Sequence, residues 1–178
     1  MTCKWNPYKS KWKAAKELNL DVSIKKEDNV LYLGASSGGT IKHLCGKTKG
    51  LIFAVEISCK MAIGLIKLAK KKRNIAPIIE DARNIKSIKK RLYKKEINIF
   101  FQDIPSKDQI DILINASKIV NKNCKIFFVL KTQSISTNIP KKTYFETIKK
   151  LEKHFEILDS KTLEPFQKKH YFFILKQK

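Results

Sequence analysis

The feature that most constrains the fold is a series of five short apolar runs separated by stretches with helical spacing. The apolar runs are Val30–Gly34, Leu51–Glu56, Ala76–Glu80, Ile97–Asp103 and Cys124–Lys131. The stretches with helical spacing are Ser58–Lys72, Ile85–Lys95 and Lys107–Asn121. Continuous apolar strands that alternate with helices are typical of a parallel sheet covered by helices on both faces.

The C-terminal part of the chain follows a different pattern. A helix is predicted over Lys141–Lys153, and two strands, Phe155–Leu163 and His170–Lys176, follow it with no helix between them. Only a turn, Glu164–Lys169, joins these strands, so they should form an antiparallel hairpin. The sequence therefore predicts an α/β fold with a mostly parallel, seven-stranded sheet. This is the sheet pattern of class I methyltransferases, whereas a nicotinamide dehydrogenase would more often continue with further βαβ units.

The length and composition predict one domain. The 178 residues suit a single α/β domain, 1–178, and the 43% hydrophobic content is enough for a packed core. Before the first strand we expect a helical lead, 1–29. No apolar run approaches the roughly 20 residues that cross a bilayer, and the N-terminus lacks the apolar segment of a secretory signal. We expect an intracellular protein with no membrane partner.

The net charge of +22 indicates a polyanionic partner. It arises from 38 basic residues against 16 acidic ones, and nearly all of the basic residues are lysines. A field of this sign attracts phosphate backbones, and a lysine, as a point charge, suits backbone steering better than the reading of base edges. The alternative is a solvated, lysine-rich surface produced by composition bias alone.

The four cysteines give no reason to expect a metal site. Cys3, Cys45, Cys59 and Cys124 form no CxxC pair and have no histidine at metal-ligand spacing. Cys45 and Cys124 should pack as small hydrophobic side chains.

A glycine-rich turn follows the first predicted strand, in the sequence LGASSGGT over 33–40. Such a turn lets the chain bend sharply and brings backbone N–H groups close to a ligand. A dinucleotide fingerprint would have glycine where Ser36 stands, so the turn alone is weak evidence for a cofactor.

Two acidic residues strengthen this interpretation. Glu56 ends the second strand 22 positions after Gly34, where a carboxylate can meet both hydroxyls of a nucleoside ribose. NAD and S-adenosylmethionine both carry that ribose. Asp81, just after the third strand, can accept a hydrogen bond from an adenine amino group, as in many methyltransferases. Alternatively, Asp81 caps the helix that follows it.

Polar residues also end the next two strands. Asp103-Ile104-Pro105-Ser106 ends the fourth strand, and it lacks the aromatic residue that follows the proline pair in amine-directed methyltransferases. Lys131 ends the fifth strand, where it is either a functional residue or a lysine whose stem packs at the sheet edge. Lys11 lies within the segment WNPYKSK.

Together these motifs resemble the fibrillarin family, the methyltransferases of box C/D guide-RNA particles. The matching segments are WNPYKSK at 5–11, YLGASSGGT at 32–40, FAVEIS at 53–58, NIAPIIEDAR at 74–83, FFQDI at 100–104, LKTQSIS at 130–136 and LEPFQKKH at 163–170. They follow the order and spacing of the family over nearly the whole chain. The small β-rich N-terminal domain of archaeal relatives has no counterpart before the WNP motif.

The resemblance implies a Rossmann-like class I methyltransferase that uses S-adenosylmethionine. The implied catalytic residues are Lys11, Asp103, Lys131 and His170. The implied cofactor-binding residues are Gly34, Ala35, Gly39, Thr40, Glu56, Ile57, Asp81, Ala82, Asp103, Ile104 and Ser106. The family usually has Thr-Thr at 39–40, Ala-Gln at 105–106 and an acidic residue at 169. The departure at 105–106 weakens the expected cofactor contact of Ser106. The departure at 169 weakens the expectation of an acidic role beside His170.

The implied reaction is methylation of an RNA ribose 2′-hydroxyl, which needs alignment and the removal of one proton. Like-charge repulsion between clustered lysines favours a neutral amine that can act as base, with Asp103 fixing its orientation. We expect Lys131 to be the base and Lys11 to orient the hydroxyl, although these roles can be exchanged. His170 is either structural or catalytic.

The implied partners are a box C/D guide RNA, substrate rRNA or tRNA, a Nop-type scaffold protein and a kink-turn-binding ribosomal-type protein. The resemblance places the protein in the cytoplasm of an archaeon or the nucleolus of a eukaryotic cell. Two other functions stay open on the residues. A nicotinamide-dependent oxidoreductase would explain the glycine turn and Glu56, and a non-catalytic RNA-binding module would explain the charge.

Overall fold

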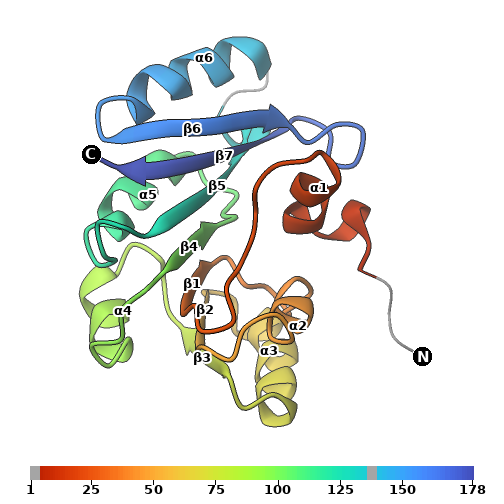
Figure 1. Ribbon diagram of the computed structural model, residues 1–178, viewed down its shortest axis with the longest axis vertical. Helices are drawn as coiled ribbons and strands as arrows, with labels where there is room; N and C mark the ends of the chain where they lie inside the picture. Colours follow the sequence, from red (N-terminus) through yellow and green to blue (C-terminus); the bar gives the residue numbers. More distant parts are fainter. Residues whose placement is uncertain (1–4, 136–139) are drawn as a thin grey trace.

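The computed structural model describes residues 5–135 and 140–178, in which seven strands form a sheet of order β3-β2-β1-β4-β5-β7-β6 (Figure 1). The strands are β1 (Val30–Leu33), β2 (Ile52–Glu56), β3 (Ile75–Ile79), β4 (Ile99–Gln102), β5 (Lys125–Lys131), β6 (Phe155–Thr162) and β7 (His170–Gln177). Neighbours among β1 to β5 are parallel, while β7 is antiparallel to both β5 and β6. The predicted parallel core with a C-terminal antiparallel hairpin is confirmed.

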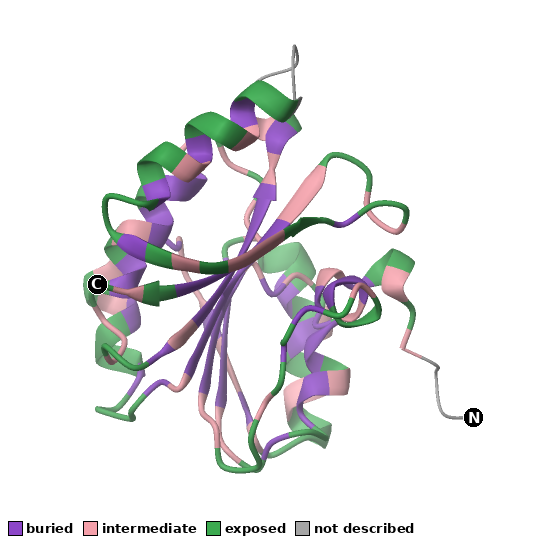
Figure 2. Cartoon of the chain, turned by 45° about the horizontal axis from the view of Figure 1, so that its top comes forward, coloured by how far each residue is buried: buried purple, intermediate pink, exposed green. Residues whose placement is uncertain are grey.

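Helices cover both faces of this sheet, as Figure 2 shows with the buried strands between two helical layers. The helices are α1 (Lys11–Glu17), α2 (Ile41–Leu44), α3 (Cys59–Lys71), α4 (Ile85–Arg91), α5 (Gln109–Ser117) and α6 (Pro140–Leu151), with short 3₁₀ turns η1 (Pro7–Lys9) and η2 (Thr132–Ser134). Helices α1 to α3 contribute to one hydrophobic cluster and α4 to α6 to the other.

The central strands are apolar up to their last residues because each of their faces is covered, and the polar residues Glu56 and Gln102 occur where β2 and β4 end. In β1, Val30 and Tyr32 belong to the cluster beneath α1 to α3, while Leu31 and Leu33 belong to the opposite cluster. All four side chains are buried. Successive side chains of a strand point to opposite faces, so apolar residues are favoured on both faces of a strand between two helical layers.

The expected helical lead, 1–29, is helical over a much shorter length. Its regular part is η1 and α1, and no helix follows between residues 18 and 29. Asn19 has a φ of 59°, which a right-handed helix cannot contain. After it, Leu20 and Val22 are buried while Asp21 and Ser23 are exposed, the alternation of an extended segment. After α1, the lead therefore packs its apolar residues as an extended chain.

Two helices are also shorter than their sequence pattern suggests. Helix α4 ends at Arg91 instead of Lys95, because Tyr93 and Lys94 adopt φ values of 50° and 56°. Helix α5 covers Gln109–Ser117, the middle of the predicted range. Helical periodicity predicted that both helices exist and the residue at which α4 begins, but not where α4 ends or where α5 begins and ends.

The buried cysteines behave as expected. Cys45 and Cys124 pack in the two hydrophobic clusters, and burial raises the pKa of the Cys124 thiol to about 12. Cys3 lies outside the described residues. Along the described residues, no helix combines the length and the apolar character that a membrane span requires.

Candidate active site

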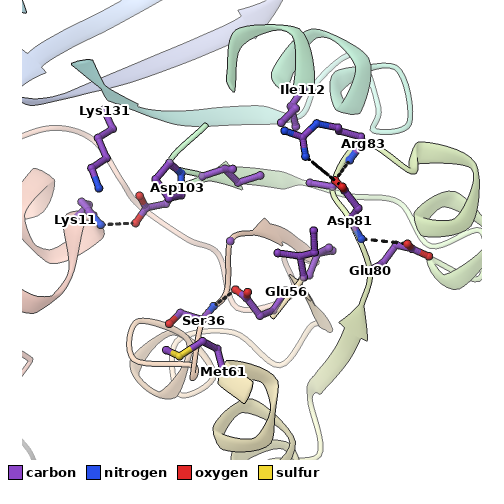
Figure 3. Close-up of a pocket in the computed structure, with 16 residues that line it drawn as sticks. Lys11, Ser36, Glu56, Met61, Glu80, Asp81, Arg83, Asp103, Ile112 and Lys131 are labelled. Atoms are coloured by element: carbon purple, nitrogen blue, oxygen red, sulfur yellow. Dashed lines mark hydrogen bonds and ion pairs between the residues drawn. The ribbon is translucent and has the colours of Figure 1, made fainter. Parts of the chain in front are cut away.

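A cavity of about 380 Å³ lies at the carboxyl ends of the parallel strands (Figure 3). Its lining residues are Lys11, Gly34, Ser36, Val55, Glu56, Ile57, Met61, Glu80, Asp81, Ala82, Arg83, Asp103, Ile104, Pro105, Ile112 and Lys131. Open α/β sheets bind ligands outside this edge, because all the parallel strands end there. The cavity joins the predicted cofactor residues to the predicted catalytic lysines.

The glycine turn brings the ends of β1 and β4 together. Gly34 has a φ of +83°, and a Cβ atom added to it would lie 2.3 Å from the carbonyl oxygen of Asp103. Any other residue would therefore push the two strand ends apart. Ser36, where a dinucleotide fingerprint has glycine, still adopts a positive φ of 51°.

Glu56 is held rigidly at the floor of the cavity. Its Oε2 accepts a hydrogen bond of 2.7 Å from the N–H of Ser36, and its Oε1 accepts one of 2.8 Å from the N–H of Ser58. The side chain is only 9% exposed. Each carboxylate oxygen has a further acceptor site, so Glu56 can bind a ligand hydroxyl without giving up these bonds.

Arg83 connects the loops that follow β3 and β4. Its guanidinium lies 3.1 Å from Asp81 Oδ1 and 2.8 Å from Asp108 Oδ2. The hydrogen bond from Arg83, with a second from Ser106, lowers the pKa of Asp108 to about 2. The interpretation of Asp81 as the helix cap is wrong: α4 is capped by Asn84, whose side chain accepts from the N–H of Ser87.

The other side of the cavity holds the predicted catalytic residues. Lys11 Nζ lies 2.9 Å from Asp103 Oδ2, and Lys131 points toward this ion pair from β5 (Figure 3). The three residues come from α1 and from the ends of β4 and β5. The structure thus brings together the residues expected to converge. Their catalytic role stays a prediction.

Lys11 reaches Asp103 because the start of α1 is fixed on both sides. Ser10 caps the helix, accepting a hydrogen bond from the N–H of Lys13, and it also accepts one of 3.0 Å from the Thr40 hydroxyl. Thr40 belongs to the glycine turn. Its side chain therefore links the turn to the helix that carries Lys11.

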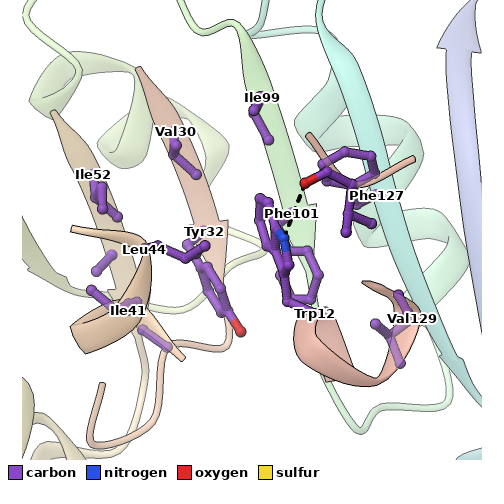
Figure 4. Close-up of a cluster of buried hydrophobic side chains, with 14 of the residues drawn as sticks. Trp12, Val30, Tyr32, Ile41, Leu44, Ile52, Ile99, Phe101, Phe127 and Val129 are labelled. Atoms are coloured by element: carbon purple, nitrogen blue, oxygen red, sulfur yellow. Dashed lines mark hydrogen bonds between the residues drawn. The ribbon is translucent and has the colours of Figure 1, made fainter. Parts of the chain in front are cut away.

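Trp12, next to Lys11, anchors α1 to the sheet (Figure 4). Its indole is 2% exposed, and its N–H donates to the carbonyl of Val22. The ring stacks on Phe101 with centroids 5.2 Å apart and meets Phe127 edge-on at 5.1 Å. These phenylalanines lie on β4, which Asp103 directly follows, and on β5, which ends at Lys131. One side chain thus ties α1 to both strands.

The WNP and LEPFQ motifs contact each other although they lie at opposite ends of the chain. Gln167 donates a hydrogen bond of 3.0 Å to the carbonyl of Pro7, and Tyr8 meets Phe166 edge-on with centroids 5.3 Å apart. The turn between β6 and β7 therefore supports the segment that leads into Lys11.

His170 stands opposite Lys131 in the β5–β7 pairing but does not line the cavity. Its Nδ1 is 2.8 Å from the carbonyl oxygen of Lys168. Burial lowers the pKa of the His170 imidazole, and the positive charges of Lys11 and Lys131 lower it further. The ring is thus close enough for the charges of Lys11, Asp103 and Lys131 to act on its pKa. Whether His170 is catalytic or structural stays open.

Four predicted cofactor residues lie outside the cavity lining: Ala35, Gly39, Thr40 and Ser106. Ala35 is buried. Gly39 is exposed, and a Cβ atom added to it would have no atom within 4 Å beyond its chain neighbours. Thr40 binds Ser10, as described above, and Ser106 binds Asp108 and Arg83. A cofactor contact by any of them stays a prediction.

Several lining residues were not singled out from the sequence. They are Ser36, Val55, Met61, Glu80, Arg83, Pro105 and Ile112. Ser36, Arg83 and Pro105 lie inside or beside motifs that were recognised, so their neighbours gave a signal. Met61 and Ile112 lie on α3 and α5, where they read as ordinary apolar helix positions.

The chain is similar to proteins of one family. A family model described as Fibrillarin matches residues 3–178. The chain is 37% identical over 172 residues to the rRNA 2′-O-methyltransferase fibrillarin 2 of Arabidopsis thaliana, with 93% of this chain and 53% of the relative covered. It is 33% identical over 181 residues to the fibrillarin-like rRNA/tRNA 2′-O-methyltransferase of Methanosarcina acetivorans, with 98% and 79% covered. The chain thus spans about half the length of its plant relative.

Solved structures show the same similarity. A fibrillarin/Nop5p complex contains a chain with a TM-score of 0.90 and 28% identity, covering 98% of this chain and 84% of that one. The fibrillarin of Aeropyrum pernix, solved with natively bound S-adenosyl-L-methionine, has a TM-score of 0.84 and 28% identity, with 96% and 76% covered.

Proposed function

This chain belongs to the fibrillarin family, and from that premise we propose that it is an S-adenosylmethionine-dependent RNA 2′-O-methyltransferase of a box C/D guide ribonucleoprotein. The observation that carries the proposal is the Lys11–Asp103 ion pair with Lys131 beside it, at the edge of a cavity that has a fixed carboxylate, Glu56, on its other side. This arrangement offers a nucleoside site and a proton-transfer site within one cavity.

The residues present fit S-adenosylmethionine. Glu56 would accept from the ribose hydroxyls, because its oxygens face the cavity and are already oriented by two backbone N–H groups. Ile57, Met61 and Ile112 supply apolar contacts suited to a flat base, and Asp81 supplies an acceptor near them. When bound, the cofactor supplies an activated sulfonium methyl group.

The protein's own task is then to align a ribose hydroxyl and remove its proton. Lys11 is paired with Asp103, and the remaining N–H groups of its ammonium can donate a hydrogen bond to the hydroxyl oxygen. Among the described residues Lys131 forms no ion pair with a carboxylate, so no carboxylate has to be displaced before a substrate hydroxyl reaches its amine. This difference favours Lys131 as base and Lys11 as the orienting cation.

The substrate in this proposal is rRNA or tRNA positioned by a guide RNA. The charge of +22 supports binding to a phosphate backbone without reading its sequence. The proposed protein partners are a Nop-type scaffold, in line with the fibrillarin/Nop5p complex, and a kink-turn-binding ribosomal-type protein. The complex would work in the cytoplasm of an archaeon or the nucleolus of a eukaryotic cell.

The first test is cofactor choice. Calorimetry of the purified chain with S-adenosylmethionine and, separately, with NAD distinguishes the methyltransferase from a nicotinamide oxidoreductase. We expect binding of S-adenosylmethionine only. Preferential binding of NAD would contradict the proposal.

The second test is guided methyl transfer. The chain is assembled with the scaffold, the kink-turn-binding protein and a guide RNA, and mass spectrometry measures 2′-O-methyl ribose at the paired nucleotide. We expect methylation at that nucleotide and very little from the chain alone, since positioning of the target depends on the guide. Absence of any transfer from a complex that binds both RNA and cofactor would favour the non-catalytic RNA-binding module.

A further inference from the structure

Gln109 is a fully buried polar side chain in contact with the main chain of Lys131. It is the first residue of α5 and is 0% exposed. Its Oε1 accepts a hydrogen bond of 3.0 Å from the N–H of Lys131, and its Nε2 lies 3.2 Å from the carbonyl oxygen of the same residue. The carboxamide thus binds both polar groups of one peptide residue.

These bonds replace a missing strand neighbour. The pairing of β5 with β4 ends at Gln102 and Phe128, three residues before β5 itself ends at Lys131. Beyond that point β4 no longer supplies donors and acceptors on that side of β5. A glutamine carboxamide has the same donor and acceptor as a backbone peptide, so Gln109 continues the hydrogen bonding that the strand has stopped providing.

The same carboxamide also reaches the loop that carries Asp103. Gln109 Nε2 donates a hydrogen bond of 2.9 Å to the carbonyl of Ser106, in the segment between β4 and α5. Gln102, the residue before Asp103, donates through its side chain to the carbonyl of Gln109 at 2.6 Å. Gln109 is therefore bonded to Lys131, to Ser106 within the loop after Asp103, and to Gln102 just before Asp103.

Gln102 is buried, with one of its two side-chain polar atoms unsatisfied among the described residues. The side chain is 0% exposed, and in the described part of the chain its Oε1 has no hydrogen-bond partner. A buried acceptor without a donor is unfavourable, and an apolar residue at this strand position would avoid the problem. The hydrogen bond that the Gln102 side chain does make goes to the carbonyl of Gln109.

We propose that Gln109 is a positioning residue that sets the location of Lys131 relative to Asp103. The inference rests on the proposed function, in which Lys131 is the base. Through Gln109, the backbone of Lys131 and the loop after Asp103 move as one unit. The opposite side of β5 is held independently, since the Thr132 hydroxyl donates to the carbonyl of Lys169.

The test is Gln109→Met, which keeps the length of the side chain and removes its three side-chain hydrogen bonds, while the backbone carbonyl of residue 109 can still accept from Gln102. Displacing a reacting group by about 1 Å can lower the rate roughly 100-fold, so we expect turnover in the guided assay to fall about 10- to 100-fold. The dissociation constant for S-adenosylmethionine should change less than about threefold, because Gln109 does not line the cavity that holds Glu56 and Gly34.

The matched control is Gln177→Met. Gln177 also uses its carboxamide to bind two backbone carbonyls, those of Ser117 and Asn121. It lies at the far end of β7, away from the cavity, because β7 is antiparallel to β5. We expect this variant to keep the turnover of the wild type. An equal loss of turnover in both variants would show a general structural effect and overturn the proposal.

A second variant and a second measurement cover the case in which Gln109→Met does not fold. Gln109→Glu has nearly the same shape and keeps the acceptor for the Lys131 N–H, but its carboxylate meets two carbonyl oxygens. We expect it to lower turnover as well, with cofactor affinity preserved. Full activity of either folded variant would refute the positioning role.

Hydrogen exchange separates this proposal from the proposed function, because it needs no activity. By NMR, the Lys131 amide should exchange about tenfold faster or more in Gln109→Met, relative to the amides of Phe127 and Phe128 on the same strand. If the assembled wild-type chain transfers no methyl group, the proposed function fails. The exchange rate of the Lys131 amide still tests whether Gln109 holds the backbone of Lys131. Unchanged exchange of the Lys131 amide would overturn the inference.

Discussion

The two sides of the cavity are built in different ways. The side with Gly34, Glu56 and Asp81 comes from one continuous part of the chain, 34–83, and each residue is the last of a strand or follows a strand within two residues. The side with Lys11, Asp103 and Lys131 combines a short helix near the N-terminus with the ends of two strands. The first side needs only the parallel sheet, whereas the second needs a helix to be docked at its edge.

This difference has a physical basis. Glu56 is fixed by hydrogen bonds from the N–H groups of Ser36 and Ser58, and these bonds form whenever the two strand ends are in register. Lys11 depends on contacts made by its neighbours, above all the burial of Trp12 against β4 and β5. The binding side should therefore tolerate changes in α1, and the reactive side should not.

The largest expected effect is on the reactive side alone. Lys131→Ala should lower turnover by about 10²–10⁴, as expected for loss of a proton-transfer group, with the affinity for S-adenosylmethionine nearly unchanged. Single-turnover methyl transfer and calorimetry measure the two quantities. Full activity of this variant would leave the proposed mechanism without its base.

The next effect concerns the docking of α1. Trp12→Ala should reduce the free energy of unfolding by about 3–5 kcal/mol, typical of truncating a buried tryptophan. If the variant is folded at low temperature, its turnover should fall more than its cofactor affinity. Denaturant unfolding and calorimetry measure these effects. The control is Phe155→Ala, also buried but on β6 in the opposite cluster, which should destabilise the protein without this selective loss.

The binding side is probed by Glu56→Ala. Loss of a charged hydrogen-bond acceptor should weaken the binding of S-adenosylmethionine by about 1–3 kcal/mol. Calorimetry measures the affinity, with Glu156→Ala, exposed on β6, as the control. An unchanged dissociation constant would mean that the cofactor does not contact Glu56, and the division of the cavity into two sides would fail.

A smaller effect concerns the pH dependence of stability. The pKa of His170 is lowered in the folded protein, so below its unfolded value of about 6.5 the unfolded chain binds more protons. The stability contributed by the neutral imidazole is therefore present above pH 6.5 and lost as the pH falls toward the folded pKa. His170→Gln should show a flatter decline in unfolding free energy over that window. A decline identical to that of the wild type would contradict the shift.

The smallest effect is expected at a surface lysine that does not line the cavity at the carboxyl ends of the strands. Lys71→Ala, at the C-terminal end of α3, should weaken RNA binding slightly and reduce the salt dependence by at most about one unit in the slope. Filter binding at several salt concentrations measures this slope. The rate at saturating RNA should not change, and a large loss of that rate would place the RNA path over α3.

The sequence predicted the sheet well because each strand has a local signature. The five parallel strands and the hairpin begin and end within two residues of their predicted ends. The prediction of helix was wrong over 18–29. Leu20 and Val22 are buried there in an extended segment, and only the surface on which the segment packs shows why these two residues turn inward. Arg83 was missed as a site residue because its partner Asp108 is 25 positions away.

The sequence by itself determined the order of the elements and the identity of the residues at the strand ends. Apolar periodicity and glycine turns are local properties, and parallel strands bring their carboxyl ends to one edge whatever the details of packing. Only the tertiary structure decided that Lys11 lies 2.9 Å from Asp103, 92 positions away in the chain, and that Gln109 holds the backbone of Lys131. Such contacts depend on how Trp12 and α5 fill the space beside β4 and β5. Packing of that kind acts between surfaces, and no local pattern in the chain records it.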